Sequence, residues 1–227
     1  MTASRAADAG SKAVINTAES PARSTKKIEG IKLRTSIVIT GTPGVGKSTI
    51  SKIIAQRLSG INIDCGRVAL KEGMTKEYDT QNKTHTINER LLSRRLKEII
   101  TKHASDLILE GHFIPRISGF KPERVFVLRC HPRKIIDRLE KKGYSKSKIA
   151  ENVAAEILDF CLRDAIQVFG KTKIFEIDNS KNKPNLMATM ILSILEGKIR
   201  PKSKHIDWIS KLEKEKSLQE ILKYIEN

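Results

Sequence analysis

A glycine-rich segment carries the clearest chemical signal in the sequence. Residues 41–48 read GTPGVGKS, which matches the pattern G-x-x-x-x-G-K-[ST], and they stand between an apolar segment typical of a strand and an amphipathic segment typical of a helix. Glycines let successive backbone N–H groups of such a loop point at phosphate oxygens, and the following helix adds the positive end of its dipole. The residues predicted to bind ATP are Gly41, Gly44, Val45, Gly46, Lys47, Ser48 and Thr49.

Two side chains of this loop have distinct expected roles. The Lys47 ammonium should reach the β- and γ-phosphates of ATP, and the Ser48 hydroxyl should ligate Mg²⁺. A phosphate-binding strand also needs a neighbouring strand that ends in a carboxylate, which holds the water shell of the metal. Residues 107–110 read LILE and make Glu110 the candidate for that second metal position. ATP and Mg²⁺ are therefore the expected cofactors.

A histidine and a cationic segment complete the candidate chemistry. His112 follows Glu110 by two residues, close enough to face the phosphates, although a lone histidine at a strand exit is more often structural than catalytic. Arg138 and Lys142 belong to a cation-rich segment with a glycine hinge at Gly143, which would neutralise charge during phosphoryl transfer. The alternative is a solvated turn between two helices.

Two signals of regulatory GTPases are missing. The sequence contains no Asn-Lys-x-Asp motif for guanine, and no Asp-x-x-Gly follows the candidate magnesium strand. These absences make a regulatory GTPase a poor fit. Phosphoryl transfer and ATP-driven work remain as the two readings of the motifs.

The elements that must position these residues alternate between strands and helices. Strands are predicted at residues 36–40, 61–63, 106–110, 124–129 and 173–178. Apolar periodicity predicts a helix at 50–58, one that begins with a capping box at Thr86 and Glu89, and one long helix after Ser145. Residues 65–85 look irregular apart from a possible helix at 67–72. This order predicts a three-layer α/β/α sandwich with a central parallel sheet of about five strands.

The composition indicates which partners and which cellular location to expect. The 227 residues carry a formal net charge of +17, which favours a polyanionic partner such as RNA or an unusual intracellular ionic setting. Three cysteines without metal-binding spacing fit a reducing cytosol, so we expect a cytoplasmic location. No apolar stretch reaches the roughly 20 residues of a membrane span. Residues 1–33 are poor in large apolar side chains and are predicted to be a disordered basic tail.

Four segments together resemble one known family. They are the loop GTPGVGKST at 41–49, the exit Glu110-Gly111-His112, the strand end at 127–129, and the run RLEKKGYSKSKIAENVAAE at 138–156. In this order and spacing they resemble adenylate kinase isoenzyme 6 and its archaeal relatives, over about residues 35–195. The loop is common to many kinases, whereas the acid-x-His exit and the Lys-Gly-Tyr run are more specific to this family.

The resemblance implies reversible transfer of phosphate from ATP to AMP, ATPase activity, and a role in small ribosomal subunit maturation through a small-subunit ribosomal protein and pre-ribosomal rRNA. It implies a kinase domain at 34–197, with a monophosphate-binding lobe at about 61–87 and a lid at about 141–150. The sequence departs from the family at three places. Glu110 stands where the family commonly has Asp, and Lys142 stands where it usually has Arg. Residues 66–68 read Gly-Arg-Val where the family tends to have Gly-Asp-Leu. These departures concern turnover and acceptor choice rather than ATP binding.

Three functional hypotheses follow. The first is a nucleoside monophosphate kinase in which Lys47 and Mg²⁺ screen charge while Arg138, Lys142 and Arg129 close on the transferred group. The second is an ATPase that switches a ribosome-assembly interaction, with His112 positioning water. The third is a kinase for another small acceptor or for RNA ends.

The segment 198–227 does not belong to the predicted kinase core. It is predicted to form a basic linker followed by two amphipathic helices, of which the second begins with a capping box at Ser217 and Glu220. Its apolar faces could dock back on the core, or its cations could approach ribosomal RNA.

Overall fold

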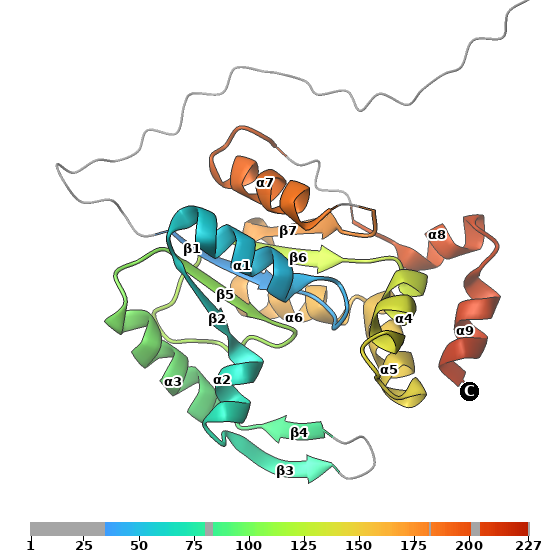
Figure 1. Cartoon of the computed structure of the whole chain (residues 1–227), viewed down its shortest axis with the longest axis horizontal. Coiled ribbons are helices and arrows are strands. Elements are labelled where there is room, and N and C mark those ends of the chain that lie inside the picture. The colour runs from blue at the N-terminus through green and yellow to red at the C-terminus, as the bar shows by residue number, and fades with distance from the viewer. Residues whose placement is uncertain (1–34, 80–83, 182, 201–204, 227) are drawn as a thin grey trace, which may run out of the picture.

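The computed structural model of the chain describes residues 35–79, 84–181, 183–200 and 205–226. The predicted disordered tail at 1–33 lies outside the described residues. A parallel sheet of five strands forms the centre, in the order β2-β5-β1-β6-β7 (Figure 1). Its strands are β1 (Ser36–Thr40), β2 (Ile61–Asp64), β5 (Leu107–Gly111), β6 (Arg124–Arg129) and β7 (Ile174–Asp178). The predicted sheet is therefore confirmed.

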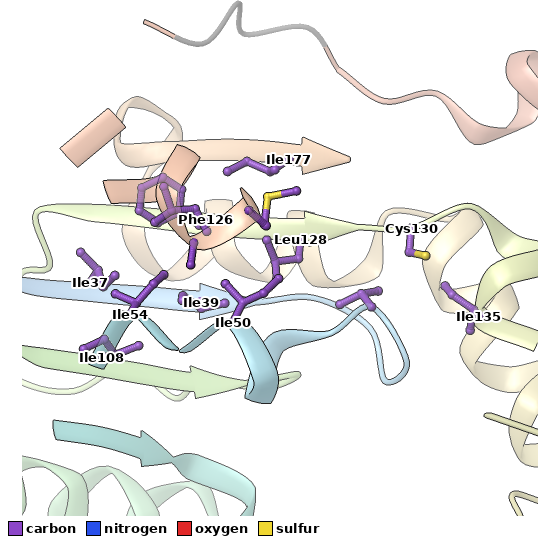
Figure 2. Close-up of a cluster of buried hydrophobic side chains, with 14 of the residues drawn as sticks. Ile37, Ile39, Ile50, Ile54, Ile108, Phe126, Leu128, Cys130, Ile135 and Ile177 are labelled. Atoms are coloured by element: carbon purple, nitrogen blue, oxygen red, sulfur yellow. The ribbon is translucent and has the colours of Figure 1, made fainter. Parts of the chain in front are cut away.

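Helices cover both faces of this sheet because alternate strand residues point to opposite sides. Ile37 and Ile39 of β1 pack in the same buried cluster as α1 (Lys47–Leu58) and α7 (Pro184–Leu195), and Figure 2 shows part of that cluster. Val38 packs on the other side. The elements on that side are α2 (Cys65–Lys71), α3 (Glu89–Lys102) and α6 (Phe160–Phe169). This is the predicted three-layer sandwich.

Two of the remaining helices lie at the carboxyl edge of the sheet. Helices α4 (Pro132–Glu140) and α5 (Lys146–Ile157) form a hairpin beside it, and a short 3₁₀ helix, η1 (Lys171–Lys173), precedes β7. Thr40 of β1 pairs in register with Gly111 of β5 and with Val127 of β6. The central strand and its neighbours thus bring the loops that follow them to one edge of the sheet.

Two predictions for the region before α3 were wrong. Residues expected to be irregular include an antiparallel hairpin, β3 (Thr75–Asp79) and β4 (Thr84–Ile87). Short polar strands lack an apolar pattern, so only their pairing with each other reveals them. Thr86 is part of β4 and does not cap α3. The cap is Asn88, whose side chain accepts a hydrogen bond from the Leu91 N–H.

The long helix predicted after Ser145 is broken into α5 and α6. Asp159 stands at the break with a left-handed backbone (φ 58°), and its carboxylate lies 2.5 Å from Nη2 of Arg129. Apolar periodicity continues across the break and so could not reveal it. The ion pair with a distant strand accompanies the change of direction.

The C-terminal helices α8 (Trp208–Lys214) and α9 (Leu218–Glu226) dock on the core. Trp208, Leu212 and Ile221 are almost completely buried in the same cluster as Ile135 and Leu139 of α4. The predicted second helix exists, but its capping box does not form as predicted. The Ser217 hydroxyl donates to the Leu212 carbonyl, and Glu220 pairs with Arg133. Within the part of the chain described, no helix is both long and apolar enough to cross a bilayer.

Candidate nucleotide-binding site

The loop at residues 41–46 connects β1 to α1 and has the backbone of a phosphate cradle. Gly46 stands at the N-terminus of α1 with φ 104° and no capping side chain. Ser48 and Thr49 in the first turn are exposed. A Cβ atom at Gly41 would lie 2.3 Å from the Leu128 carbonyl oxygen, so only glycine fits there. Unsatisfied N–H groups at a helix N-terminus attract anions.

The Lys47 side chain folds back over this loop. Its ammonium donates to the carbonyl oxygens of Gly41 (2.7 Å) and Thr42 (3.1 Å). Burial lowers the pKa of Lys47, while the negative charges of Glu110, Asp64 and Glu156 oppose this shift. The cation therefore has acidic neighbours and two carbonyl partners, and a phosphate at the loop would give it a stronger partner.

Glu110 is the penultimate residue of β5, lies close enough to Lys47 to influence its charge, and has unused hydrogen-bonding capacity. The side chain is 2 % exposed, and its Oε1 accepts a hydrogen bond from Nδ2 of Asn62 at 3.1 Å. Glu110 Oε2 and Asn62 Oδ1 are buried and have no hydrogen-bond partner. Buried acceptors without donors are costly, so this pair favours a hydrated cation as its ligand.

These residues fit Mg²⁺, which binds oxygen and keeps several waters. Across the described residues, no group of three or more His, Cys, Asp and Glu side chains is arranged to hold a metal. A magnesium ion here would depend on nucleotide phosphates and water as well as on the exposed hydroxyl of Ser48 and the carboxylate of Glu110.

His112 lies just beyond Glu110 with its side chain at the surface of the site. Loss of hydration lowers the pKa of His112, and the positive charges of Lys47 and Lys148 act in the same direction, while Asp64 opposes them. The imidazole is therefore held more strongly in its neutral form than a free histidine. A neutral imidazole can accept a proton or orient a water molecule.

Arg138 and Asn179 form hydrogen bonds to backbone carbonyls of the loop. Nη1 of Arg138 donates to the Gly44 carbonyl at 3.0 Å, and Nη2 donates to the Asn179 carbonyl at 3.4 Å. The Asn179 amide in turn donates to the Val45 carbonyl at 2.7 Å. Asn179 was missed in the sequence, although a polar residue directly after a parallel strand is a usable signal.

Arg129 and Lys142, which were also predicted to act on the transferred phosphate, lie in different surroundings. Arg129 is 1 % exposed and forms ion pairs with Glu156 (2.9 Å), Asp159 (2.5 Å) and Glu176 (2.8 Å). The expectation that it closes on a transferred phosphate is therefore wrong, because three carboxylates already occupy its guanidinium. Lys142 lies exposed in the turn between α4 and α5, within the predicted lid.

A phosphate cradle at the carboxyl edge of a parallel sheet, with a lysine folded over it and a carboxylate nearby that has one unpartnered oxygen, places this chain among the P-loop phosphotransferases. Residues 37–159, more than half of the chain, match the family described as an AAA domain. The protein named "Putative adenylate kinase" from Methanococcus maripaludis is 38 % identical over 178 residues, which cover 76 % of this chain and 94 % of that protein.

Further relatives agree with this placement. The protein of the same name from Methanocaldococcus jannaschii is 37 % identical over 77 % of this chain and 93 % of its own length. The "Adenylate kinase isoenzyme 6 homolog" of Caenorhabditis elegans is 29 % identical over 64 % of this chain and 80 % of its own length. The chain belongs to the adenylate kinase isoenzyme 6 family, together with these archaeal proteins.

Proposed function

We propose that this protein is a nucleoside monophosphate kinase that transfers the γ-phosphate of ATP reversibly to AMP. The observation that carries the proposal is that Lys47 folds over the loop while Glu110, close enough to influence its charge, keeps a buried oxygen, Oε2, without a hydrogen-bond partner. A cation and a carboxylate with an unused oxygen suit the phosphates and the metal of Mg-ATP. The relatives named as adenylate kinases support AMP as the acceptor.

In the proposed reaction the chain positions its substrates and forms no covalent intermediate. The loop N–H groups and Lys47 bind the β- and γ-phosphates of ATP. Bound Mg²⁺ would supply charge neutralisation, with Ser48 and Glu110 as its holders. Arg138 fixes the loop carbonyl at Gly44. Lys142 would approach the transferred group when the predicted lid at 141–150, made of the turn after α4 and the start of α5, closes over the acceptor lobe at 61–87.

One assay tests the acceptor. ADP formation from Mg-ATP is measured with each nucleoside monophosphate in turn and with ATP alone. Strong stimulation by AMP supports the proposal, and stimulation by a different monophosphate would replace AMP as the acceptor. Equal rates with and without every monophosphate would leave only hydrolysis.

We propose ATP hydrolysis as a second activity, because burial and the charge of Lys47 lower the pKa of His112, which favours the neutral imidazole that can orient a water molecule. In this role the protein would act in small ribosomal subunit maturation and rRNA processing in the cytoplasm. Its partners would be a small-subunit ribosomal protein and pre-ribosomal rRNA. The net charge of +17 supports a polyanionic partner.

The surface for such a partner is tested with the full chain, since removing α8 would expose the apolar positions that it covers. Lys214 and Lys216 are exposed near the end of α8. The double variant Lys214→Glu and Lys216→Glu is compared with Lys97→Glu and Lys102→Glu, a charge-matched control on α3. Co-sedimentation with small-subunit particles is measured across a salt series, and the first variant should bind less tightly with a shallower salt dependence. Equal binding by both double variants would remove α8 from the partner surface.

A further inference from the structure

One buried carboxylate joins the phosphate loop to the C-terminal helices. Glu156 lies on α5 and is 1 % exposed. Its Oε2 accepts a hydrogen bond from the Thr42 hydroxyl of the loop at 2.6 Å. Its Oε1 accepts hydrogen bonds from the indole Nε1–H of Trp208 (2.9 Å), from Nε of Arg129 (2.9 Å) and from the Cys130 N–H (3.0 Å). Residues 42 and 208 thus bind opposite oxygens of a single side chain.

The charges around Glu156 explain why the C-terminal segment docks here. Arg129 is one guanidinium among three carboxylates, those of Glu156, Asp159 and Glu176. Acceptors therefore outnumber the donors that Arg129 can offer, and buried acceptors need further donors. Residues 205–208 supply them. The His205 imidazole contacts Asp159 (3.2 Å) and Glu176 (3.1 Å), the Ile206 N–H donates to Glu176 (3.4 Å), and the Trp208 indole donates to Glu156.

Packing fixes the indole in the orientation that this bond requires. Trp208 is 0 % exposed, and its ring meets the His131 ring edge-on with centroids 5.6 Å apart. Nζ of Lys211 lies 4.4 Å from the ring centroid on α8 itself. A side chain held on several sides transmits a displacement of α8 to the carboxylate rather than absorbing it.

The other oxygen of Glu156 acts on the part of the loop that controls Lys47. Thr42 is 1 % exposed, so its hydroxyl has little access to water as a replacement partner. The Thr42 carbonyl accepts hydrogen bonds from the Lys47 ammonium (3.1 Å) and from the Val45 N–H (3.3 Å). The position of Thr42 therefore influences both the lysine and the loop backbone that would face the phosphates.

We propose that Glu156 is a positioning residue of the nucleotide site, and that docking of α8 through Trp208 is needed for full affinity for ATP. The inference rests on the proposed binding of ATP at the loop. With α8 docked, Glu156 is held between Trp208 and Thr42 and keeps the loop in its binding shape. With α8 displaced, Oε1 of Glu156 loses one of its three donors and keeps Arg129 and Cys130, so the carboxylate shifts toward these and the loop becomes less ordered. By linkage, bound ATP must stabilise the docked position of α8 by the same factor.

The first test removes the indole N–H and retains an aromatic ring, through Trp208→Phe in the full chain. Calorimetry with Mg-ATP should give an affinity about fivefold or more below that of the wild type. Leu96→Val and Leu96→Ala serve as controls, because Leu96 is buried in the cluster on the other face of the sheet. The control whose loss of thermal stability is closer to that of Trp208→Phe should bind ATP like the wild type. A Trp208→Phe variant that binds as tightly as this control would overturn the inference.

A double-mutant cycle separates positioning from general loosening. Thr42→Val removes the loop hydroxyl with little change of shape, and so removes the hydrogen bond between the loop and Glu156. If Trp208 acts on the loop through Glu156, adding Trp208→Phe to Thr42→Val should weaken ATP binding much less than Trp208→Phe does alone. Independent, multiplicative losses would show that the two residues act separately and would overturn the proposal.

Hydrogen exchange on the wild type keeps the proposal testable if a variant fails to fold. Saturating Mg-ATP should slow amide exchange in residues 208–214 by the factor by which α8 docking raises the affinity, while α3 serves as the internal reference. Unchanged exchange in α8 with ATP bound would overturn the coupling alone. A wild-type protein that does not bind ATP would overturn the proposed function and the coupling with it.

Discussion

Replacing Glu110 by Gln should stabilise the ligand-free protein and impair its reaction. Glu110 Oε2 and Asn62 Oδ1 are buried acceptors without donors, and a buried acceptor that lacks its hydrogen bond costs about 1–3 kcal/mol. The Gln amide has almost the same volume, removes a buried charge and adds a donor. Lys47 loses one of the carboxylates that offset its own burial, which opposes this gain. We expect a net gain of about 1 kcal/mol, or a rise in Tm of roughly 2–4 °C.

Turnover should change in the opposite direction. The carboxylate is proposed to hold the water shell of Mg²⁺, and loss of such an outer-shell partner typically lowers activity about 10- to 100-fold. Glu110→Asp is the matched control because it keeps the charge and should keep more of the magnesium dependence. Mg-ATP should also raise the Tm of the wild type more than that of Glu110→Gln, because a ligand stabilises the state that it binds.

The assays are thermal unfolding without and with Mg-ATP, and turnover across a magnesium series. A Glu110→Gln variant that is less stable than the wild type and retains its turnover would refute both parts of this reasoning. Such a result would mean that Glu110 is a structural carboxylate satisfied by its surroundings. Loss of turnover without any gain in stability would contradict only the argument from unpaired acceptors.

Three further predictions concern the cations and the histidine of the site. Lys47→Met should lower kinase and ATPase turnover by at least about 100-fold while circular dichroism stays native, and full activity or loss through unfolding alone would contradict the role of Lys47. Because the pKa of His112 is held below its usual value, activity that needs the neutral imidazole should fall only as the pH drops through that lowered pKa. The His112→Gln variant should not show this fall at low pH. If the wild type and the variant have the same pH profile, His112 does not orient the water. Lys142→Arg should raise turnover, since guanidinium can bind two phosphate oxygens, and Lys142→Ala should lower it; no change in either variant would assign Lys142 to a solvated turn.

Elements with a strong local signal were predicted correctly. The strand, loop and helix from residue 36 to 58 follow from apolar residues, glycines and helical spacing within a short stretch. The three central strands were found because buried parallel strands are nearly continuous apolar runs, whereas the edge strands β2 and β7 show alternating apolar residues. The hairpin β3–β4 lacked such a run and was missed.

Charged residues show where prediction from sequence ended. Arg129 looked like a cation available for phosphate, yet its partners Glu156 and Glu176 are far along the chain. Asp159 breaks a helix whose apolar pattern is uninterrupted. A local pattern gives the type of a side chain but not its partners, and the role of a buried charge is set by its partners.

The sequence by itself determined that this chain has a phosphate-binding loop at the edge of a parallel sheet, because glycine conformation, helix dipole and apolar patterning act within a few residues. Only the tertiary structure decided that α8 docks on the core and that Glu156 binds both Thr42 and Trp208. Those contacts join residues more than fifty positions apart. Their formation depends on burial of Trp208 and on an excess of carboxylates around Arg129, which exist only once the sheet and its helices are assembled.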